Sequence, residues 1–484
     1  MKLLRGVYEG PGSHGILRVS ASLARVQAVL RASPEEGYFP ALLGSRTKRM
    51  DPEPAPVSLS PIWDRGSLSG SSWAPGNLSQ DLANTVRRHP EAETVVLARS
   101  ETALLSGEEL PELSIPGGEE EPPPKLVTFG WESPGLRETE AADLALAELV
   151  RAYAAPAERT EEPTVNIFGP PVFNPGAAAE VAEVERLLGL LGVGVNARVP
   201  LGARARDLEG LPRAWANVLL YREVGDGATL YLKSEFGTPR VTTPMVGAAG
   251  TGAVLRAVGE LCSLDAQRVR RLVWSELADT ARLPWYARLA SPESIGGRRV
   301  AIFGDFTYAI GLGYTMAREV GLEVGPCGTY MEHLERDFLF HANTFTDDAF
   351  VTDDPEKVAS RIESASPDLV VGTHLEREVA ASLGVPFLPL LSPAASLPFV
   401  ERPLMGYAGS GVLADALEDA LRGVPREKSR ETGDSGVPWT EGALEELEGV
   451  SAFLRGRSRR LAEQRAEELG STEVTRRIFR ESRS

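Results

Sequence analysis

Short apolar runs, each followed by an amphipathic stretch, recur along the chain. The two clearest are Val165–Gly169, followed by helical periodicity over Ala178–Leu191, and Val300–Gly304, followed by helical periodicity over Ile310–Val320. Runs that are apolar at every position and bounded by turns are typical of strands whose two faces are both covered. Strands that alternate with helices in this way predict an α/β fold built on parallel sheets.

Four further apolar runs extend this pattern. Leu369–Thr373 and Val385–Leu391 are expected to continue the sheet that starts with Val300–Gly304, and Thr94–Ala98 and Lys125–Phe129 are expected strands of the first part of the chain. The pattern therefore predicts three α/β units in succession along the chain.

The N-terminal segment 10–39 predicts one amphipathic helix that ends in an acidic loop. Its apolar residues recur at steps of three and four, which places the following on one helical face: Ile16, Val19, Leu23, Val26 and Leu30. Pro34 is expected to stop the helix and Gly37 to permit a sharp bend, so that Glu35 and Glu36 lie at the helix end. A carboxylate there is suited to bind a metal, but the residue type alone favours an ordinary solvated loop.

Changes in composition mark the expected domain boundaries. Segments 111–125 and 156–163 are rich in proline and glutamate, and 422–436 is polar. A chain of 484 residues is long enough for about three domains of ordinary size. We predict a first α/β domain over 1–162 that carries the Glu36 loop, Rossmann-like domains over 163–297 and 298–425, and a small helical module over 437–484 with helices at 440–465 and 472–480.

Charge and hydropathy exclude two classes of function. The chain carries 51 basic and 68 acidic residues, a formal charge of −17, which argues against nucleic-acid binding. Its apolar runs are all shorter than the roughly 20 residues that a membrane span needs, and residues 1–12 lack the apolar stretch of a signal peptide. A cytoplasmic protein without a membrane span is therefore expected.

The cysteine count limits what this chain can bind alone. Cys262 and Cys327 are its only cysteines, and they lie in separate segments without a CxxC pattern. Neither a disulfide framework nor a self-contained zinc or iron–sulfur site is expected, and two buried small hydrophobes are the favoured interpretation. The sequence also lacks a Gly-x4-Gly-Lys-Ser/Thr loop, so ATP is not expected to bind this chain through a Walker motif.

Polar residues follow two of the predicted strands. Asp305 lies where ligands gather in open α/β sheets, but it is equally suited to cap the following helix. Glu376 and Arg377 follow another strand and favour a structural role in orienting loops. His374, beside them, is suited to face either a ligand or the solvent.

Ordered strings along nearly the whole chain resemble the B subunits of light-independent protochlorophyllide reductases, a nitrogenase-like family. The N-terminal match comprises Gly10, Pro11, His14, Gly15, Arg18, Val19 and Tyr38. Later strings include Asp207–Gly225, Leu283–Arg288, Ile302–Ala309, Gly372–Arg377 and Met405–Gly409. The resemblance implies three Rossmann-like domains and a C-terminal helical extension.

The resemblance also implies a cofactor, partners and a reaction. The acidic residue two positions before Tyr38, here Glu36 in place of the family aspartate, would ligate a 4Fe-4S cluster shared with an N-type subunit that supplies three cysteines. The implied assembly is a heterotetramer with that subunit, served by an L-type iron–sulfur reductase that holds the ATP. Its reaction is the ferredoxin-driven reduction of a ring C=C bond of protochlorophyllide.

Several positions depart from the family pattern. The family's proton-donor aspartate corresponds to Ser291, which is no acid near neutral pH, and Glu293 is the nearest replacement if the loop is remodelled. Glu101 stands where the family has a cysteine near the cluster, and Ala395 lies where a family histidine is missing. Ala408 and Gly409 occupy the place of a substrate-contacting Glu-Gly pair.

Three hypotheses follow from the match and its departures. The leading one is a B-type subunit of the protochlorophyllide reductase. The first alternative is a degenerate, non-catalytic or repurposed paralogue that keeps the scaffold and the subunit interface. The second is a nitrogenase-like reductase that acts on another tetrapyrrole.

Overall fold

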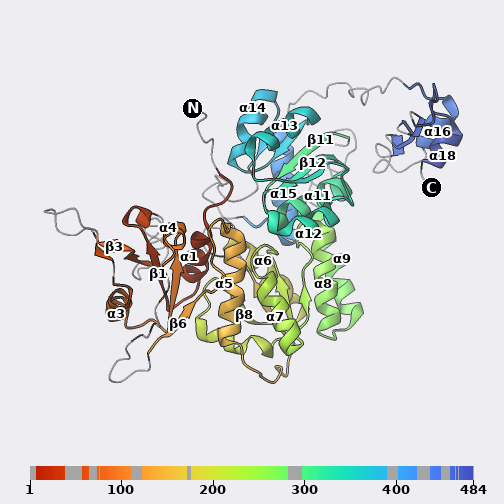
Figure 1. The fold of residues 1–484 in the computed structure, drawn as a ribbon. Helices are drawn as coiled ribbons and strands as arrows, with labels where there is room; N and C mark the ends of the chain where they lie inside the picture. Colours follow the sequence, from red (N-terminus) through yellow and green to blue (C-terminus); the bar gives the residue numbers. More distant parts are fainter. Residues whose placement is uncertain are drawn as a thin grey trace.

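Among the residues that the structure describes, three sheets are parallel and a fourth, two-stranded sheet is antiparallel (Figure 1). The computed structural model describes residues 7–38, 57–64, 74–75, 77–108, 110, 113, 115, 123–169, 171, 176–281, 297–389, 402–421, 437–448, 458–459, 461–463, 465–466 and 468–482. The predicted α/β fold with parallel sheets is confirmed.

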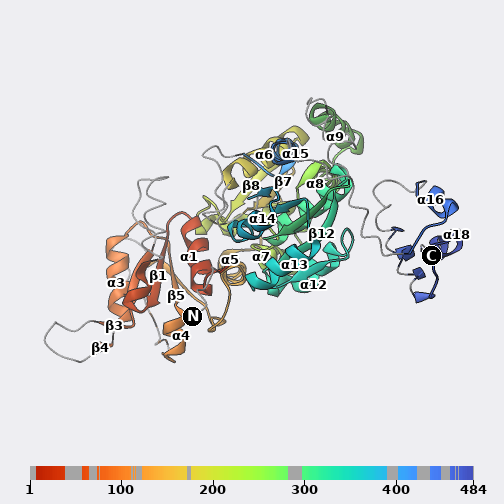
Figure 2. The same ribbon diagram turned by 90° about the horizontal axis from the view of Figure 1, so that it is seen from above.

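The first sheet has the strand order β2-β1-β5-β6. Its strands are β1 (Val26–Ala32), β2 (Val57–Pro61), β5 (Thr94–Arg99) and β6 (Lys125–Thr128), and the short antiparallel ribbon is β3 (Trp63–Asp64) with β4 (Ala74–Pro75). Helices α1 (Gly12–Ser22) and α5 (Glu138–Tyr153) pack against each other beside this sheet, and α3 (Leu78–Arg88) covers its other face (Figure 2). Helix α4 (Glu101–Leu105) and the 3-10 turn η1 (Pro34–Gly37) follow the carboxyl ends of β5 and β1.

The single helix predicted over residues 10–39 is wrong beyond Ser22. Val26 and Leu30 belong to β1, whose seven residues are all buried. The chain leaves the helix through Arg25, which has a positive φ of 58° although it is not a glycine. The two polar residues of β1, Gln27 and Arg31, are buried and four positions apart, so they do not reveal a period of two, and the apolar residues around them also fit helical spacing.

The second sheet has the order β10-β9-β7-β8. Its strands are β7 (Thr164–Phe168), β8 (Gly194–Val199), β9 (Ala216–Leu219) and β10 (Arg240–Val241). Around it lie α6 (Ala177–Leu191), η2 (Ala205–Arg213), α7 (Asp226–Phe236), α8 (Gly247–Leu261) and α9 (Ala266–Ala281). The predicted strand at 165–169 and the helix at 178–191 are confirmed to within one residue at each end.

The third sheet has the order β13-β12-β11-β14-β15. Its strands are β11 (Arg299–Phe303), β12 (Glu323–Thr329), β13 (Ala349–Val351), β14 (Leu369–Val371) and β15 (Phe387–Leu388). Its helical segments are α11 (Phe306–Thr315), the π-helical η3 (Met316–Val320), η4 (Glu332–Leu334), α12 (Glu335–Ala342), α13 (Pro355–Ala365), η5 (His374–Glu376), α14 (Arg377–Leu383) and α15 (Gly406–Leu421). The helix predicted from Ile310 begins four residues earlier, at Phe306, and the strand predicted over 385–391 is described only as β15.

The hydrophobic cores cross the predicted domain boundaries. One buried cluster joins residues of the second and third sheets, and another joins the first sheet to η2 and to the ends of β7, β8 and β9. Helix α5 contacts α1 on one side and α7 on the other, and α15 packs against α6, α8 and α9. The boundaries at 162/163 and 297/298 therefore stay a prediction.

The C-terminal helices have a small core of their own. Helices α16 (Glu441–Glu448) and α18 (Arg476–Glu481) contact each other around Ala443, Leu447, Ala462, Ala466, Val474, Ile478 and Phe479. The Trp439 Nε1 donates to Glu463 Oε1 at 2.9 Å beside this core. Among the helices that the structure describes, none is both long and apolar enough to cross a membrane.

Replacement of the α13 cap gives a first test of the fold. Asp354 Oδ1 accepts a hydrogen bond from the Glu356 N–H at 3.0 Å, and Pro355 occupies the first helical position. We expect Asp354→Ala to lower the free energy of unfolding by about 1 kcal/mol in denaturant titrations. The neighbouring Asp353 pairs with Arg137 at the surface, so Asp353→Ala is the control, with an expected change below about 0.5 kcal/mol. Equal losses in the two variants would contradict the capping role.

Candidate functional site

Glu36 closes the turn that follows β1. Its Oε2 accepts a hydrogen bond from the Ser33 N–H at 2.8 Å, which completes a capping box with Ser33 in η1. The Ser-Pro-Glu-Glu sequence carries this signal, because serine followed three residues later by glutamate is the pattern of such a box. Pro34 therefore starts a helical turn after a strand rather than ending a helix.

Two hydroxyl groups of the α4 segment also bind the Glu36 carboxylate. Ser100 Oγ donates to Oε2 at 2.7 Å, and Thr102 Oγ1 donates to Oε1 at 3.0 Å. Strands β1 and β5 are parallel neighbours, so the segments that follow them meet at the same edge of the sheet. Burial acts to raise the pKa of Glu36, but the hydrogen bonds from Ser100, Ser33 and Thr102 outweigh it and hold the pKa below its usual value.

The surroundings of Glu36 combine polar groups with exposed apolar side chains. The ring of His14, from α1, meets the ring of Tyr38 edge-on at 6.0 Å, and burial lowers the pKa of His14. Glu101 begins α4 and accepts a hydrogen bond from the Gly135 N–H at 3.2 Å. The side chains of Tyr38 and Leu105 are 64% and 73% exposed, respectively.

A buried arginine supports this edge of the first sheet. Arg31, in β1, is only 1% exposed, and its guanidinium donates to Glu108 at 2.9 and 2.5 Å, to Ser60 Oγ at 3.1 Å and to the Pro61 carbonyl at 2.5 Å. Its own carbonyl accepts from the Ser100 N–H at 2.9 Å. The start of α4 is therefore tied to β1, five residues before Glu36.

Two other residues of the sequence-predicted site, Ala408 and Gly409, are not brought to Glu36. Ala408 and Gly409 lie in α15, where the Ala408 N–H donates to Glu183 Oε1 of α6 at 3.2 Å. A Cβ on Gly409 would overlap the backbone of Leu404, which explains a glycine there by packing. Ser291, Glu293 and Ala395 lie outside the residues that the structure describes.

The polar residues that follow the third-sheet strands have structural partners. Glu376 forms a capping box with Thr373, with two contacts of 2.7 Å, and accepts a hydrogen bond from Tyr8 at 2.6 Å, which confirms its predicted role in orienting the loop. Asp305 precedes α11, but its carboxylate accepts from the Tyr330 hydroxyl and caps no helix N–H. His374 is exposed.

A buried cluster of carboxyl and phenol groups lies where the second and third sheets meet, and the sequence patterns did not reveal it. The Tyr308 hydroxyl donates to Glu180 and lies 2.8 Å from the Tyr221 hydroxyl, and Thr307 Oγ1 donates to Glu223 at 2.5 Å. Burial raises the pKa of Glu180 to about 8, and burial together with the charge of Asp305 raises that of Glu223 to about 8. A cavity of only about 40 Å³ adjoins Glu223 and Asp305.

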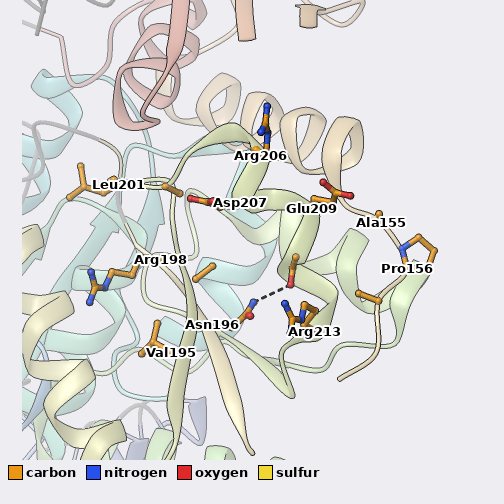
Figure 3. Close-up of a pocket in the computed structure, with 15 residues that line it drawn as sticks. Ala155, Pro156, Val195, Asn196, Arg198, Leu201, Arg206, Asp207, Glu209 and Arg213 are labelled. Atoms are coloured by element: carbon orange, nitrogen blue, oxygen red, sulfur yellow. Dashed lines mark hydrogen bonds between the residues drawn. The ribbon is translucent and has the colours of Figure 1, made fainter. Parts of the chain in front are cut away.

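A larger cavity among the described residues lies elsewhere, beside the edge strand β8 (Figure 3). It has a volume of about 740 Å³, and Arg206, Asp207, Glu209 and Arg213 surround it as exposed side chains. Asp207 accepts from the Arg204 N–H at 2.8 Å, so it caps its own turn. None of the sequence-predicted site residues lines this cavity, which leaves Glu36 as the stronger candidate among the described residues.

The described residues hold no metal-binding group on their own. No three His, Cys, Asp or Glu side chains among them come together in a way that could hold a metal ion. Cys262 and Cys327 are both buried, and burial raises the pKa of the Cys262 thiol to about 11. Within the part of the chain that the structure describes, no second and third metal-binding side chains therefore stand beside Glu36.

Comparison with known proteins identifies the family. Residues 68–422 match the family model of nitrogenase component 1 type oxidoreductases. The B subunit of light-independent protochlorophyllide reductase from Heliobacterium modesticaldum is 31% identical over 98% of this chain and 96% of its own length. The corresponding B subunit from Chlorobium limicola is 30% identical over 100% of this chain and 99% of its own, and that from Leptolyngbya boryana is 28% identical over 99% and 98%.

A solved structure supports the same fold. A nitrogenase structure described as Cp1 at pH 6.5 superposes with a TM-score of 0.66, at 15% identity, over 87% of this chain and 94% of its own. That likeness agrees with the three parallel sheets found here. The chain therefore belongs to the nitrogenase component 1 type oxidoreductases and, within them, to the family of light-independent protochlorophyllide reductase B subunits.

Proposed function

We propose that this chain is the B-type subunit of a light-independent protochlorophyllide reductase. The reaction is the ATP-dependent reduction of one ring C=C bond of protochlorophyllide, with electrons derived from ferredoxin, to give chlorophyllide for (bacterio)chlorophyll synthesis. Besides the named relatives, the observation that carries the proposal is the Glu36 carboxylate, held by three hydrogen bonds at a partly exposed edge of the first sheet.

Glu36 fits one ligand position of a 4Fe-4S cluster. A carboxylate offers about four acceptor positions, and the hydrogen bonds described above use three of them. Because the described part of this chain groups no further metal ligands, the remaining ligands are assigned to cysteines of an N-type partner subunit. Such a cluster, when bound, supplies low-potential electrons for the reduction.

The surface beside Glu36 suits contact with that partner. Tyr38 follows Glu36 by two residues and Leu105 ends α4, and both large side chains are more than half exposed. Exposed apolar groups around a polar centre are typical of a protein interface. We assign this face to the N-type subunit of a heterotetramer, and the ATP to an L-type reductase, since the sequence has no Walker motif.

Two further assignments remain part of the proposal. Ser291 and Glu293 mark the altered proton-donor loop, in which Glu293 is the residue with an acid suited to the task. Ala408 and Gly409 mark the substrate-contacting turn, and Ala408 is exposed at the start of α15. Of the two, only Ala408 is exposed, so its methyl group would contact the pigment through apolar packing.

The test is anaerobic co-expression with N-type and L-type subunits. We expect a brown complex with an iron–sulfur EPR signal that reduces protochlorophyllide when ATP and a reductant are supplied. Glu36→Gln keeps the size of the side chain but removes the anionic ligand, so iron content and activity should fall roughly tenfold or more. Glu35→Gln, one residue away and exposed, is the matched control. A colourless, iron-free wild-type complex that leaves the pigment unreduced would contradict the proposal.

A further inference from the structure

We propose that Ser100 and Thr102 are positioning residues that select Glu36 Oε1 as the single atom of this chain that ligates the cluster. This inference rests on the proposed function, because it concerns how the ligand carboxylate is oriented.

The two carboxylate oxygens of Glu36 are not equivalent. Oε2 accepts two hydrogen bonds, from the Ser33 N–H at 2.8 Å and from Ser100 Oγ at 2.7 Å. Oε1 accepts one, from Thr102 Oγ1 at 3.0 Å. Oε2 therefore accepts more of these hydrogen bonds than Oε1 does, which leaves Oε1 the less occupied oxygen. On this ground Oε1 is the oxygen assigned to the cluster.

The Ser100 hydroxyl is itself held in one orientation. Its oxygen accepts the Ala103 N–H at 3.2 Å as the cap of α4, while its proton goes to Glu36. The Ser100 N–H donates to the Arg31 carbonyl at 2.9 Å, which ties the cap to the strand that precedes Glu36. The two donors to Oε2 therefore come from η1 and from the start of α4, which are both held by hydrogen bonds to their surroundings. Donors that are fixed in this way also fix the orientation of the carboxylate.

This arrangement also explains the glutamate. An aspartate at position 36 would draw the carboxylate back by about one C–C bond, roughly 1.5 Å, away from hydroxyls that now lie at 2.7 and 3.0 Å. Aspartate would then lose contacts that glutamate has with α4. The positions of the Ser100 and Thr102 hydroxyls thus favour a side chain of the length of glutamate at position 36. Glu36→Asp should therefore weaken cluster retention rather than improve it.

Thr102→Val in the assembled complex is the main test, because valine keeps the shape of threonine and removes only the hydroxyl. Ser100→Ala removes the second donor, and Ser100→Thr restores a hydroxyl. The control is Ser106→Ala, since Ser106 Oγ, at the other end of α4, donates to the Ala103 carbonyl at 2.7 Å and not to Glu36. The readouts are the EPR spectrum of the reduced cluster, its midpoint potential and the rate at which a chelator removes iron.

We expect Thr102→Val and Ser100→Ala each to change the EPR line shape and the midpoint potential, and to speed iron removal by about tenfold. Ser100→Thr should return all three towards the wild type, and Ser106→Ala should change none. If Glu36→Gln lowers the iron content but both hydroxyl variants keep the wild-type spectrum, potential and removal rate, the inference is wrong. If Glu36→Gln itself leaves iron and spectrum unchanged, the proposed function fails instead.

Discussion

Gly15→Ala is expected to destabilise the protein by about 3 kcal/mol, because α1 and α5 cross at this glycine with no room for a side chain. A Cβ at residue 15 would overlap the Glu138 carbonyl oxygen and lie 2.9 Å from the Ala142 nitrogen. Both obstacles are backbone atoms of α5, so no rotamer change relieves the overlap and the two helices must separate. The requirement for close helix contact explains why glycine stands at this position of the N-terminal string.

The matched control is Gly189→Ala, at an exposed position in the last turn of α6. A Cβ there would meet nothing within 4 Å, and the residue has an ordinary helical conformation. Alanine is the better helix former, so Gly189→Ala should raise the free energy of unfolding by up to about 1 kcal/mol. Thermal and denaturant unfolding of the two variants would measure both effects. A Gly15→Ala protein as stable as the wild type would show that α1 and α5 do not pack this closely.

Some strands and helices of the second and third sheets could be predicted, because their apolar runs are bounded by turn residues. The strand at 165–169 and its helix both appear in the structure with nearly the expected bounds. The end of α1 and the start of β1 could not be predicted, because Arg25 has a positive φ, which is normally seen for glycine or asparagine. Without that signal, the fully buried β1 continued the apparent helical period.

Some contacts of the candidate site could be predicted from nearby residues in the sequence, whereas others depend on residues far apart in the chain. The capping boxes at Ser33–Glu36 and Thr373–Glu376 can be seen in the sequence as serine or threonine followed three residues later by glutamate. Ser100 and Thr102 reach Glu36 across 64 and 66 residues, respectively, so only the pairing of β1 with β5 brings them together. No pattern within a short window carries that information.

The buried carboxyl groups were missed for a different reason. Glu180 lies on α6 and Glu223 follows β9, and glutamate in such places is normally exposed. Their burial depends on α11, which follows β11 of the third sheet, because its residues Tyr308 and Thr307 donate to them. In the described residues, Glu180 Oε2 and Glu223 Oε1 have no hydrogen-bond partner, which is costly for a charged group and favours the protonated acid.

These acids should make the stability of the protein fall as the pH rises from about 4.5 to about 8. Burial raises the pKa of Glu180 from 4.5 in the unfolded chain to about 8 in the folded protein, and that of Glu223 also reaches about 8. Between those values the folded protein keeps protons that the unfolded chain has released. Each such group therefore lowers the free energy of unfolding by up to about 1.4 kcal/mol per pH unit, and its effect levels off above the folded pKa.

Glu180→Gln tests this by fixing a neutral side chain of the same shape, whose oxygen still accepts from Tyr308 and from the Leu404 N–H. We expect the free energy of unfolding of the variant to depend less steeply on pH, by about the contribution of one titrating group. The variant should also be more stable than the wild type at pH 9. Glu185→Gln, which removes a partly exposed carboxylate from the same helix, is the control and should leave the slope unchanged. Unfolding in denaturant between pH 5 and pH 9 gives the slopes. If the Glu180→Gln slope equals that of the wild type, Glu180 is charged in the folded protein. The junction between the second and third sheets must then hold a buried negative charge that its described contacts do not balance.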